Sequence, residues 1–144
     1  MQTVSSSSSS DKSVEGTNTP PHVLVVDDEF LMRWSVAETL DADGCSVREA
    51  GDGETAMRAI VDPRWPVDVV VLDYHLPDTQ SLELLSEMRR MRPECRIILM
   101  TADPDPDLTR RALALGARWV LSKPFRLSDL ESLVLGADRT RAGA

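Results

Sequence analysis

The chain has 144 residues and a formal net charge of -8. This length corresponds to about one ordinary domain, which can bury a core without disulfide or metal staples. The sequence contains no Lys/Arg-rich stripe, so direct nucleic-acid binding is not expected. No apolar stretch approaches the roughly 20 residues that span a bilayer, and the N-terminus lacks the pattern of a signal peptide. We therefore expect no membrane contact and a cytoplasmic location.

The two ends of the chain differ in composition from its middle. Residues 1–20 contain the serine run 5–10 and few apolar side chains. Burial there cannot offset the entropy of ordering, so a disordered tail is predicted. Residues 21–137 form the predicted domain. Residues 138–144 are predicted to be a flexible C-terminal tail with no output domain behind it.

From His22 onward, short runs rich in β-branched residues alternate with stretches of helical periodicity, a pattern typical of βα repeats and a parallel sheet. The predicted strands are residues 23–26, 46–49, 67–72, 96–100 and 118–121. Four stretches between or after these strands carry apolar residues at helical spacing, and each set is expected to face the sheet. The sets are Phe30, Trp34, Ala37 and Leu40; Leu82, Leu85 and Met88; Leu108, Ala112 and Leu115; and Leu127, Leu130 and Leu133. Asp105 followed by Pro106 is typical of a helix start. The sequence thus predicts an α/β domain of five strands and five helices.

Polar residues stand where four of the predicted strands end. Asp27 and Asp28 follow the first strand, Asp73 the third and Thr101 the fourth, while Lys123 comes just after the fifth. Because the carboxyl ends of parallel strands meet at the edge where open α/β folds bind ligands, these groups are expected to converge. Several carboxylates packed together repel one another unless a cation neutralises them. A hard divalent ion with oxygen ligands, such as Mg²⁺, suits this set.

Each of these residues also has a structural interpretation when it is taken alone. The consecutive aspartates could cap the following helix, Asp73 could start a turn, and Thr101 and Lys123 could be a cap and a solvated charge. Together they favour phosphoryl transfer, in which an aspartate is the nucleophile and a metal and a lysine neutralise charge. The Lys123–Pro124 bond is of the type that is cis in about one case in twenty, and a cis bond could aim the ammonium into the site.

As a set, these residues resemble the receiver domains of two-component response regulators, the CheY-like superfamily. The motifs that carry the resemblance are Val-Val-Asp27-Asp28-Glu, Leu72-Asp73 followed by Pro77, Met100-Thr101-Ala102, and Gly116-Ala117 leading to Lys123-Pro124-Phe125. The resemblance covers about residues 22–135. Residues 30–35 and 118–125 resemble receivers attached to AAA+ transcription activators of the nitrogen-regulatory type. The implied fold is a flavodoxin-like doubly wound five-stranded parallel sheet, order 2-1-3-4-5, flanked by five helices.

The resemblance also implies a role for each residue of the site. Asp73 would be the phosphoacceptor, Asp28 a direct Mg²⁺ ligand and Asp27 its water-bridged neighbour. The backbone carbonyl of His75 would be a further ligand of the metal. Thr101 and Lys123 would bind the phosphoryl oxygens. The chain would be a stand-alone response regulator that is phosphorylated by a histidine kinase or histidine phosphotransfer protein and then changes its binding to a protein partner. It would not be an enzyme beyond its own phosphorylation and dephosphorylation.

Two features depart from the usual pattern of this family. The position three residues before the lysine, usually Tyr or Phe, is Val120, and the aromatic residue is Trp119, on the opposite face of the strand. The loop at residues 102–107 is acidic and stiffened by two prolines. Because Val120 has no ring to swing inward, we expect the response to run mainly through the Thr101 loop and the helix after it.

Three other functions fit these residues less well. A haloacid-dehalogenase-like magnesium phosphohydrolase also uses a strand-end aspartate, but it needs a second aspartate two residues later, where this chain has His75. A dinucleotide or flavin binder is disfavoured because no glycine-rich loop follows the first strand. A degenerate receiver acting only as a scaffold is disfavoured because every charged residue of the site is present.

Overall fold

The computed structural model describes residues 19–136. The predicted N-terminal tail, 1–20, lies outside the described residues except for Thr19 and Pro20, and the predicted C-terminal tail, 138–144, lies outside them altogether. Within the described part of the chain, no helix is long and apolar enough to cross a membrane.

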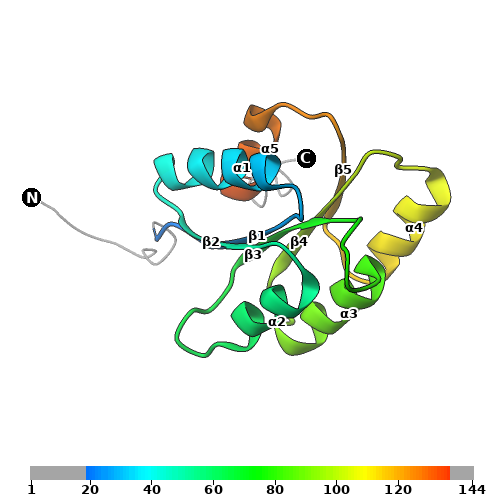
Figure 1. Cartoon of the computed structure of the whole chain (residues 1–144), viewed down its shortest axis with the longest axis horizontal. Coiled ribbons are helices and arrows are strands. Elements are labelled where there is room, and N and C mark those ends of the chain that lie inside the picture. Colours follow the sequence, from blue (N-terminus) through cyan, green and yellow to red (C-terminus); the bar gives the residue numbers. More distant parts are fainter. Residues whose placement is uncertain (1–18, 137–144) are drawn as a thin grey trace, which may run out of the picture.

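In the part of the chain that the structure describes, five parallel strands form one sheet in the order β2-β1-β3-β4-β5 (Figure 1). The strands are β1 (His22–Val26), β2 (Ser46–Ala50), β3 (Val69–Asp73), β4 (Arg96–Thr101) and β5 (Trp119–Ser122). The third strand begins at Val69 instead of Val67. With Val23 paired to Val69, Val67 would face Pro21, which has no backbone N–H for a ladder. The α/β class and the strand order are those expected.

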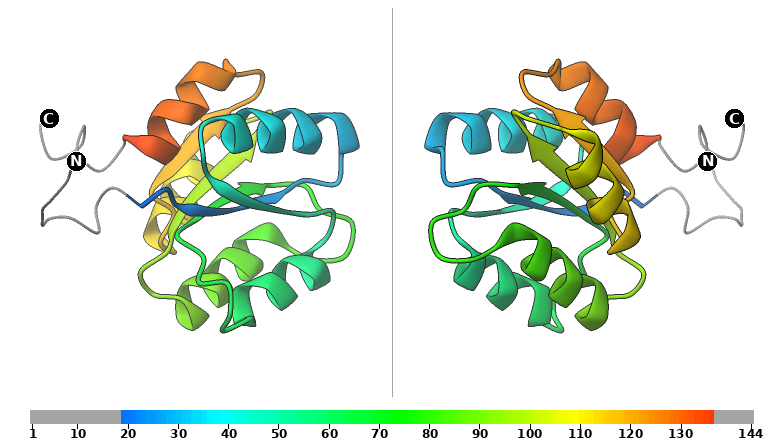
Figure 2. Two further views of the ribbon diagram at one scale, coloured as in Figure 1. Left: turned by 90° about the vertical axis from the view of Figure 1, so that its left-hand side faces the viewer. Right: turned by 90° about the vertical axis from the view of Figure 1, so that its right-hand side faces the viewer.

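Within residues 19–136, five helices cover the two faces of the sheet. They are α1 (Phe30–Ala42), α2 (Gly53–Val61), α3 (Ser81–Met91), α4 (Pro106–Ala114) and α5 (Leu127–Leu135). In Figure 2, α1 and α5 lie on one face of the sheet, and α2 and α3 lie on the other. Residues of α4 belong to the same buried cluster as those of α2 and α3. The central strand β3 is buried along its whole length, as a parallel strand covered on both faces should be.

The predicted inward face of α1 is wrong at two positions. Phe30 and Trp34 are 58% and 47% exposed. The buried residues of α1 are Val36, Ala37 and Leu40. Apolar side chains surround the N-terminal half of this helix, so sequence periodicity could not select one face, and packing against the sheet and α5 selected it. Leu115 and Leu127 are also exposed, because each stands at a helix end.

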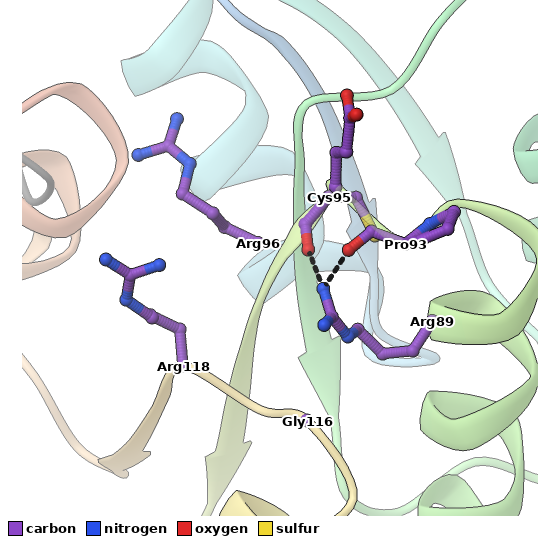
Figure 3. A pocket seen from close by; sticks show the side chains of 7 residues that line it. Arg89, Pro93, Cys95, Arg96, Gly116 and Arg118 are labelled. Carbon is purple, nitrogen blue, oxygen red and sulfur yellow. Dashed lines mark hydrogen bonds between the residues drawn. The ribbon is translucent and has the colours of Figure 1, made fainter.

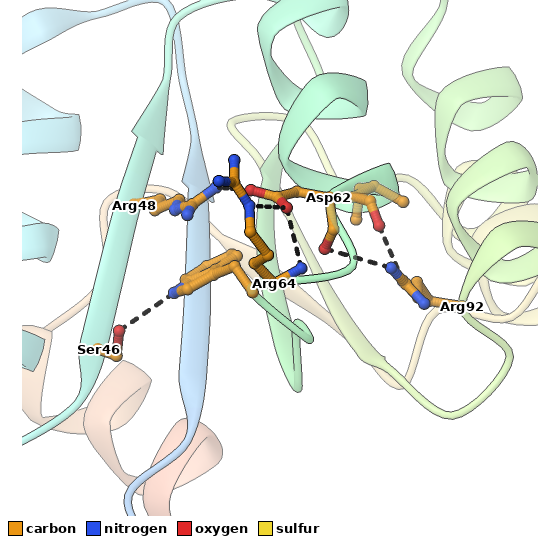
Figure 4. Close-up of polar contacts among 7 residues, drawn as sticks. Ser46, Arg48, Asp62, Arg64 and Arg92 are labelled. Carbon is orange, nitrogen blue, oxygen red and sulfur yellow. Dashed lines mark hydrogen bonds and ion pairs between the residues drawn. The ribbon is translucent and has the colours of Figure 1, made fainter.

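A polar network fixes the segment that leads into β3 (Figure 4). The Asp62 carboxylate accepts a hydrogen bond from Arg48 on β2, while the backbone carbonyl of Asp62 accepts one from Arg92 after α3. Trp65 is buried, donates to the Ser46 hydroxyl at 3.1 Å and lies under the Arg48 guanidinium. These contacts tie the segment between α2 and β3 to strand β2 and to the end of α3.

A cavity lies at the amino edge of the sheet (Figure 3), opposite the strand ends that carry the polar residues. It is lined by Arg89, Pro93, Glu94, Cys95, Arg96, Gly116 and Arg118. Arg89 donates to the backbone carbonyls of Pro93 and Cys95. Gly116 has φ +116, and a Cβ there would lie 2.8 Å from Arg89 Nε. The absence of a Cβ at Gly116 leaves room for the Arg89 side chain, whose hydrogen bonds join α3 to the turn before β4.

Candidate functional site

The carboxyl edge of the sheet brings three carboxylates together. Asp27 directly follows β1, Asp28 is the next residue, and Asp73 is the last residue of β3. One ligand oxygen from each lies within 4.8 Å of the others. Asp27 and Asp73 are buried, whereas Asp28 is exposed. The predicted convergence of these carboxylates is therefore observed.

Lys123 reaches this cluster from the segment after β5. Its Nζ lies 3.1 Å from Asp73 Oδ1 and 3.2 Å from Asp27 Oδ2. The backbone N–H of Lys123 donates to the Thr101 carbonyl at 2.8 Å, and the Lys123–Pro124 peptide bond is cis. Lys123 is thus a cation held between two buried carboxylates, and the interpretation as a solvated charge is wrong.

Thr101 is the last residue of β4, which pairs with β3, the strand that ends at Asp73. In the register of the sheet, Asp73 faces Met100, so Thr101 lies one position farther along. The Thr101 side chain is buried, and its hydroxyl oxygen accepts the backbone N–H of Asp103 at 3.2 Å. His75 lies two residues past Asp73, with its ring edge-on to Tyr74. The role of its carbonyl at a metal stays a prediction.

The capping interpretation of the consecutive aspartates is partly right. Glu29, the N-cap residue of α1, makes no side-chain cap, but its backbone N–H donates to Asp27 Oδ1 at 2.9 Å. The other Asp27 oxygen contacts Lys123. Asp27 therefore anchors the helix start with one oxygen and lines the site with the other.

The side chains of the site carry more negative than positive charge. Burial, together with the nearby negative charge of Asp27, raises the pKa of Asp73, and Lys123 offsets this only in part. Burial acts to lower the pKa of Lys123, but its hydrogen bond to Asp73 and the charges of both aspartates outweigh burial and raise it. Three carboxylates and one ammonium leave two negative charges. A divalent cation with oxygen ligands fits this donor set, and Asp27, Asp28 and Asp73 would hold it.

Val120 and Trp119 lie on opposite faces of β5, as expected. Val120 packs against the buried cluster that contains residues of α2, α3 and α4. Trp119 packs against the cluster on the side of α1 and α5. The response route inferred from this arrangement stays a prediction.

Two residues near the site make contacts that the sequence pattern does not predict. The buried Ser81 hydroxyl donates to the backbone carbonyl of Asp73 at 2.9 Å. The Asp78 carboxylate accepts backbone N–H groups from Gly53 and Glu54 at the start of α2. Both contacts join segments that no periodicity or spacing pairs, so the sequence held no signal for them.

Comparison with known proteins shows which family the chain belongs to. The family model described as the response regulator receiver domain matches residues 23–135. The chain belongs to this family. The receiver domain is 38% identical over 114 residues to the transcriptional regulatory protein PdtaR of Mycobacterium tuberculosis, covering 77% of this chain and 53% of PdtaR. It is 33% identical over 112 residues to the DNA-binding transcriptional regulator NtrC of Azospirillum brasilense, covering 78% of this chain and 23% of NtrC. The chain therefore spans about half, or less, of these relatives.

The fold of the receiver domain is also found among solved structures. A CheY-like response regulator receiver domain protein from Methanospirillum hungatei JF-1 superposes with a TM-score of 0.76 at 24% sequence identity. The match covers 87% of this chain and 99% of that chain. The flavodoxin-like fold is confirmed by this match and by the strand order.

Proposed function

We propose that this receiver domain is a phosphorylation-dependent signalling module in which Asp73 accepts a phosphoryl group from a histidine kinase or histidine phosphotransfer protein. The observation that carries the proposal is the position of Asp73, buried at the end of the central strand with Lys123 Nζ 3.1 Å away. A carboxylate nucleophile beside a fixed ammonium and two further carboxylates suits phosphoryl transfer and divalent-ion binding together.

The chemistry follows from the groups present. An Asp73 oxygen attacks the phosphorus of a phosphohistidine, the P–N bond breaks with its electrons left on the imidazole, and an acyl phosphate forms. We propose that Lys123 and the Thr101 hydroxyl contact the phosphoryl oxygens. Asp27 Oδ2 lies 3.2 Å from Lys123 Nζ, which supports a role for Asp27 in keeping the ammonium in position. Mg²⁺, when bound by the three carboxylates, supplies positive charge against the charge on those oxygens.

The first test replaces the acceptor. Wild-type protein incubated with acetyl phosphate and Mg²⁺ is expected to gain one phosphoryl group, and Asp73→Asn is expected to gain none, because an amide is a poor nucleophile. Intact-mass spectrometry measures both. Asp68→Asn is the matched control, since Asp68 is an exposed carboxylate just before the same strand, and it should be modified like wild type.

This test also bears on the alternatives. If Asp73→Asn were modified as readily as wild type, the acceptor assignment would be wrong. Steady turnover of a phosphate ester by the wild type would favour the phosphohydrolase, whereas we propose that the domain catalyses only its own phosphorylation and dephosphorylation. Failure of the wild type to accept phosphate from any donor would favour a degenerate receiver.

The surface beside the site suggests where the donor docks. Leu31 is 68% exposed, and with Phe30 and Trp34 it makes an apolar patch that begins two residues after Asp28. A cavity of about 280 Å³ adjoins this patch between the starts of α1 and α5. We propose that the histidine-bearing donor packs against this patch, because a donor must approach Asp73 from this edge of the sheet and its apolar contacts can begin there.

Replacing the exposed leucine separates docking from chemistry. The donor is a histidine phosphotransfer protein that phosphorylates the wild type. With this donor, Leu31→Ser is expected to be phosphorylated about tenfold more slowly, which is the effect of losing one well-packed interface side chain. The rate with acetyl phosphate should not change, because a small donor needs no docking surface. Val61→Ser is the control, since Val61 is 47% exposed at the far end of α2. Equal slowing with both donors would place Leu31 in the chemistry and contradict the docking role.

A further inference from the structure

The loop between β3 and α3, residues 74–80, is anchored at both of its ends. The backbone N–H of Tyr74 donates to the Met100 carbonyl at 2.8 Å, and the Ser81 hydroxyl donates to the Asp73 carbonyl at 2.9 Å. This loop includes His75, whose backbone carbonyl is a metal ligand by the resemblance to receiver domains. What holds the middle of the loop therefore bears on the metal site.

The middle of the loop is bound to the start of α2 through one side chain. Asp78 Oδ1 accepts the Gly53 N–H at 2.8 Å, and Asp78 Oδ2 accepts the Glu54 N–H at 3.1 Å. The approach is close, because a Cβ on Gly53 would lie 2.6 Å from Thr79 Cγ2. The two oxygens of one carboxylate thus bind two N–H groups that have no acceptor within their own helix. These groups lie in the first turn, where negative charge is favoured.

Helix α2 has a separate cap of its own. Asp52 is its N-cap residue, and its side chain accepts the Thr55 N–H at 2.8 Å. The helix start is therefore capped from its own sequence, whereas Asp78 comes from a segment about 25 residues away. Two aspartates serve the same helix end, and only one of them also fixes the loop beside the site.

We propose that Asp78 is a positioning residue for the divalent cation, which latches the loop to α2 and holds the His75 carbonyl where a metal ligand is needed. The inference rests on the proposed function, since that function supplies the metal. A ligand already held in its binding conformation costs less to order when the ion arrives, and groups that orient metal ligands typically change metal affinity by about 10- to 100-fold when removed. Asp78 itself does not touch the ion.

The coupling between the Asp78 contact with α2 and metal binding must act in both directions. If the latch favours metal binding, metal binding favours the closed latch by the same factor. The Gly53 and Glu54 amides, which donate to Asp78, should therefore exchange their hydrogens more slowly when Mg²⁺ is present. This readout needs no phosphorylation and no kinase.

The test compares two aspartates of one helix end. Mg²⁺ is titrated into wild type, Asp78→Ala and Asp52→Ala, and the dissociation constant and amide exchange are followed by NMR. Asp78→Ala is expected to bind Mg²⁺ about tenfold more weakly and to lose the Mg²⁺-dependent protection at Gly53 and Glu54. Asp52→Ala removes the same charge and a cap, so it should lower the melting temperature but leave Mg²⁺ affinity within about twofold.

Each outcome decides between the two proposals. No Mg²⁺ binding by wild type would overturn the proposed metal site. Normal wild-type binding with unchanged affinity in Asp78→Ala would overturn the latch alone, as would equal weakening by Asp52→Ala. Gly53→Ala, which pushes Thr79 away from the helix, provides a second disruption if Asp78→Ala does not fold, and it should also weaken Mg²⁺ binding.

Discussion

Replacing Lys123 by alanine is expected to lower the free energy of unfolding of the ion-free protein by about 2 kcal/mol at neutral pH. Removing one partner of a buried ion pair costs roughly 3–5 kcal/mol because the other charge is left unpaired. The Lys123 side chain is 18% exposed, so water lessens that cost. The expected loss reflects two buried carboxylates, Asp27 and Asp73, that then face each other without a cation.

The loss should depend on pH in a defined direction. The pKa of Asp73 is raised in the folded protein by burial and by Asp27, and loss of Lys123 would raise it further. A carboxyl group whose pKa is higher folded than unfolded holds its proton more tightly in the folded state. Its contribution to stability therefore falls as pH rises from about 4 through the folded-state pKa. The deficit of Lys123→Ala should be small at acid pH and should grow toward neutral pH.

Urea unfolding of wild type and Lys123→Ala in the presence of EDTA, at pH 5 and at pH 7.5, measures this loss of unfolding free energy. Arg110→Ala is the control, because Arg110 is an exposed cation paired with Asp107 on the surface of α4, and such pairs contribute about 0–1 kcal/mol. A Lys123→Ala deficit that is the same at both pH values, or no larger than that of Arg110→Ala, would show that Lys123 does not neutralise the buried pair.

Replacing Asp28 by asparagine is expected to remove most of the stabilisation that Mg²⁺ gives. An ion that binds only the folded state at 100 times its dissociation constant stabilises that state by about 2.7 kcal/mol. Asp28 is exposed and supplies one of the three clustered carboxylate oxygens. Its amide substitute should therefore leave the ion-free protein nearly as stable as wild type while it weakens the metal site.

Thermal unfolding with and without Mg²⁺ separates these two effects. Glu29→Gln is the matched control, because Glu29 is the next exposed carboxylate along the chain and lies outside the cluster. It should keep the full Mg²⁺-dependent rise in melting temperature. If Asp28→Asn kept that rise and Glu29→Gln lost it, the assignment of the metal ligands would be wrong.

Much of the fold and of the site could be predicted from local sequence. Strands buried on both faces must be continuous and apolar, so runs such as 69–72 stand out, and the polar residue that ends each run falls at the carboxyl edge of a parallel sheet. This rule predicted that four side chains converge at that edge: Asp27, Asp73, Thr101 and Lys123. Capping is equally local, and Asp105 does cap α4 by accepting the Leu108 N–H at 2.8 Å.

Contacts between distant segments were decided only by the tertiary structure. The sequence by itself determined the alternation of strands and helices, because burial and backbone hydrogen bonding within each element depend on neighbouring residues. It could not determine which face α1 buries, since apolar side chains surround the start of that helix and only packing excludes Phe30 and Trp34 from the core. Nothing in the sequence indicated that Asp78 binds the start of α2, or that the Ser81 hydroxyl donates to the backbone carbonyl of Asp73. Hydrogen bonds of this kind depend on where two segments come to lie in space, and that position is set by the packing of the whole domain.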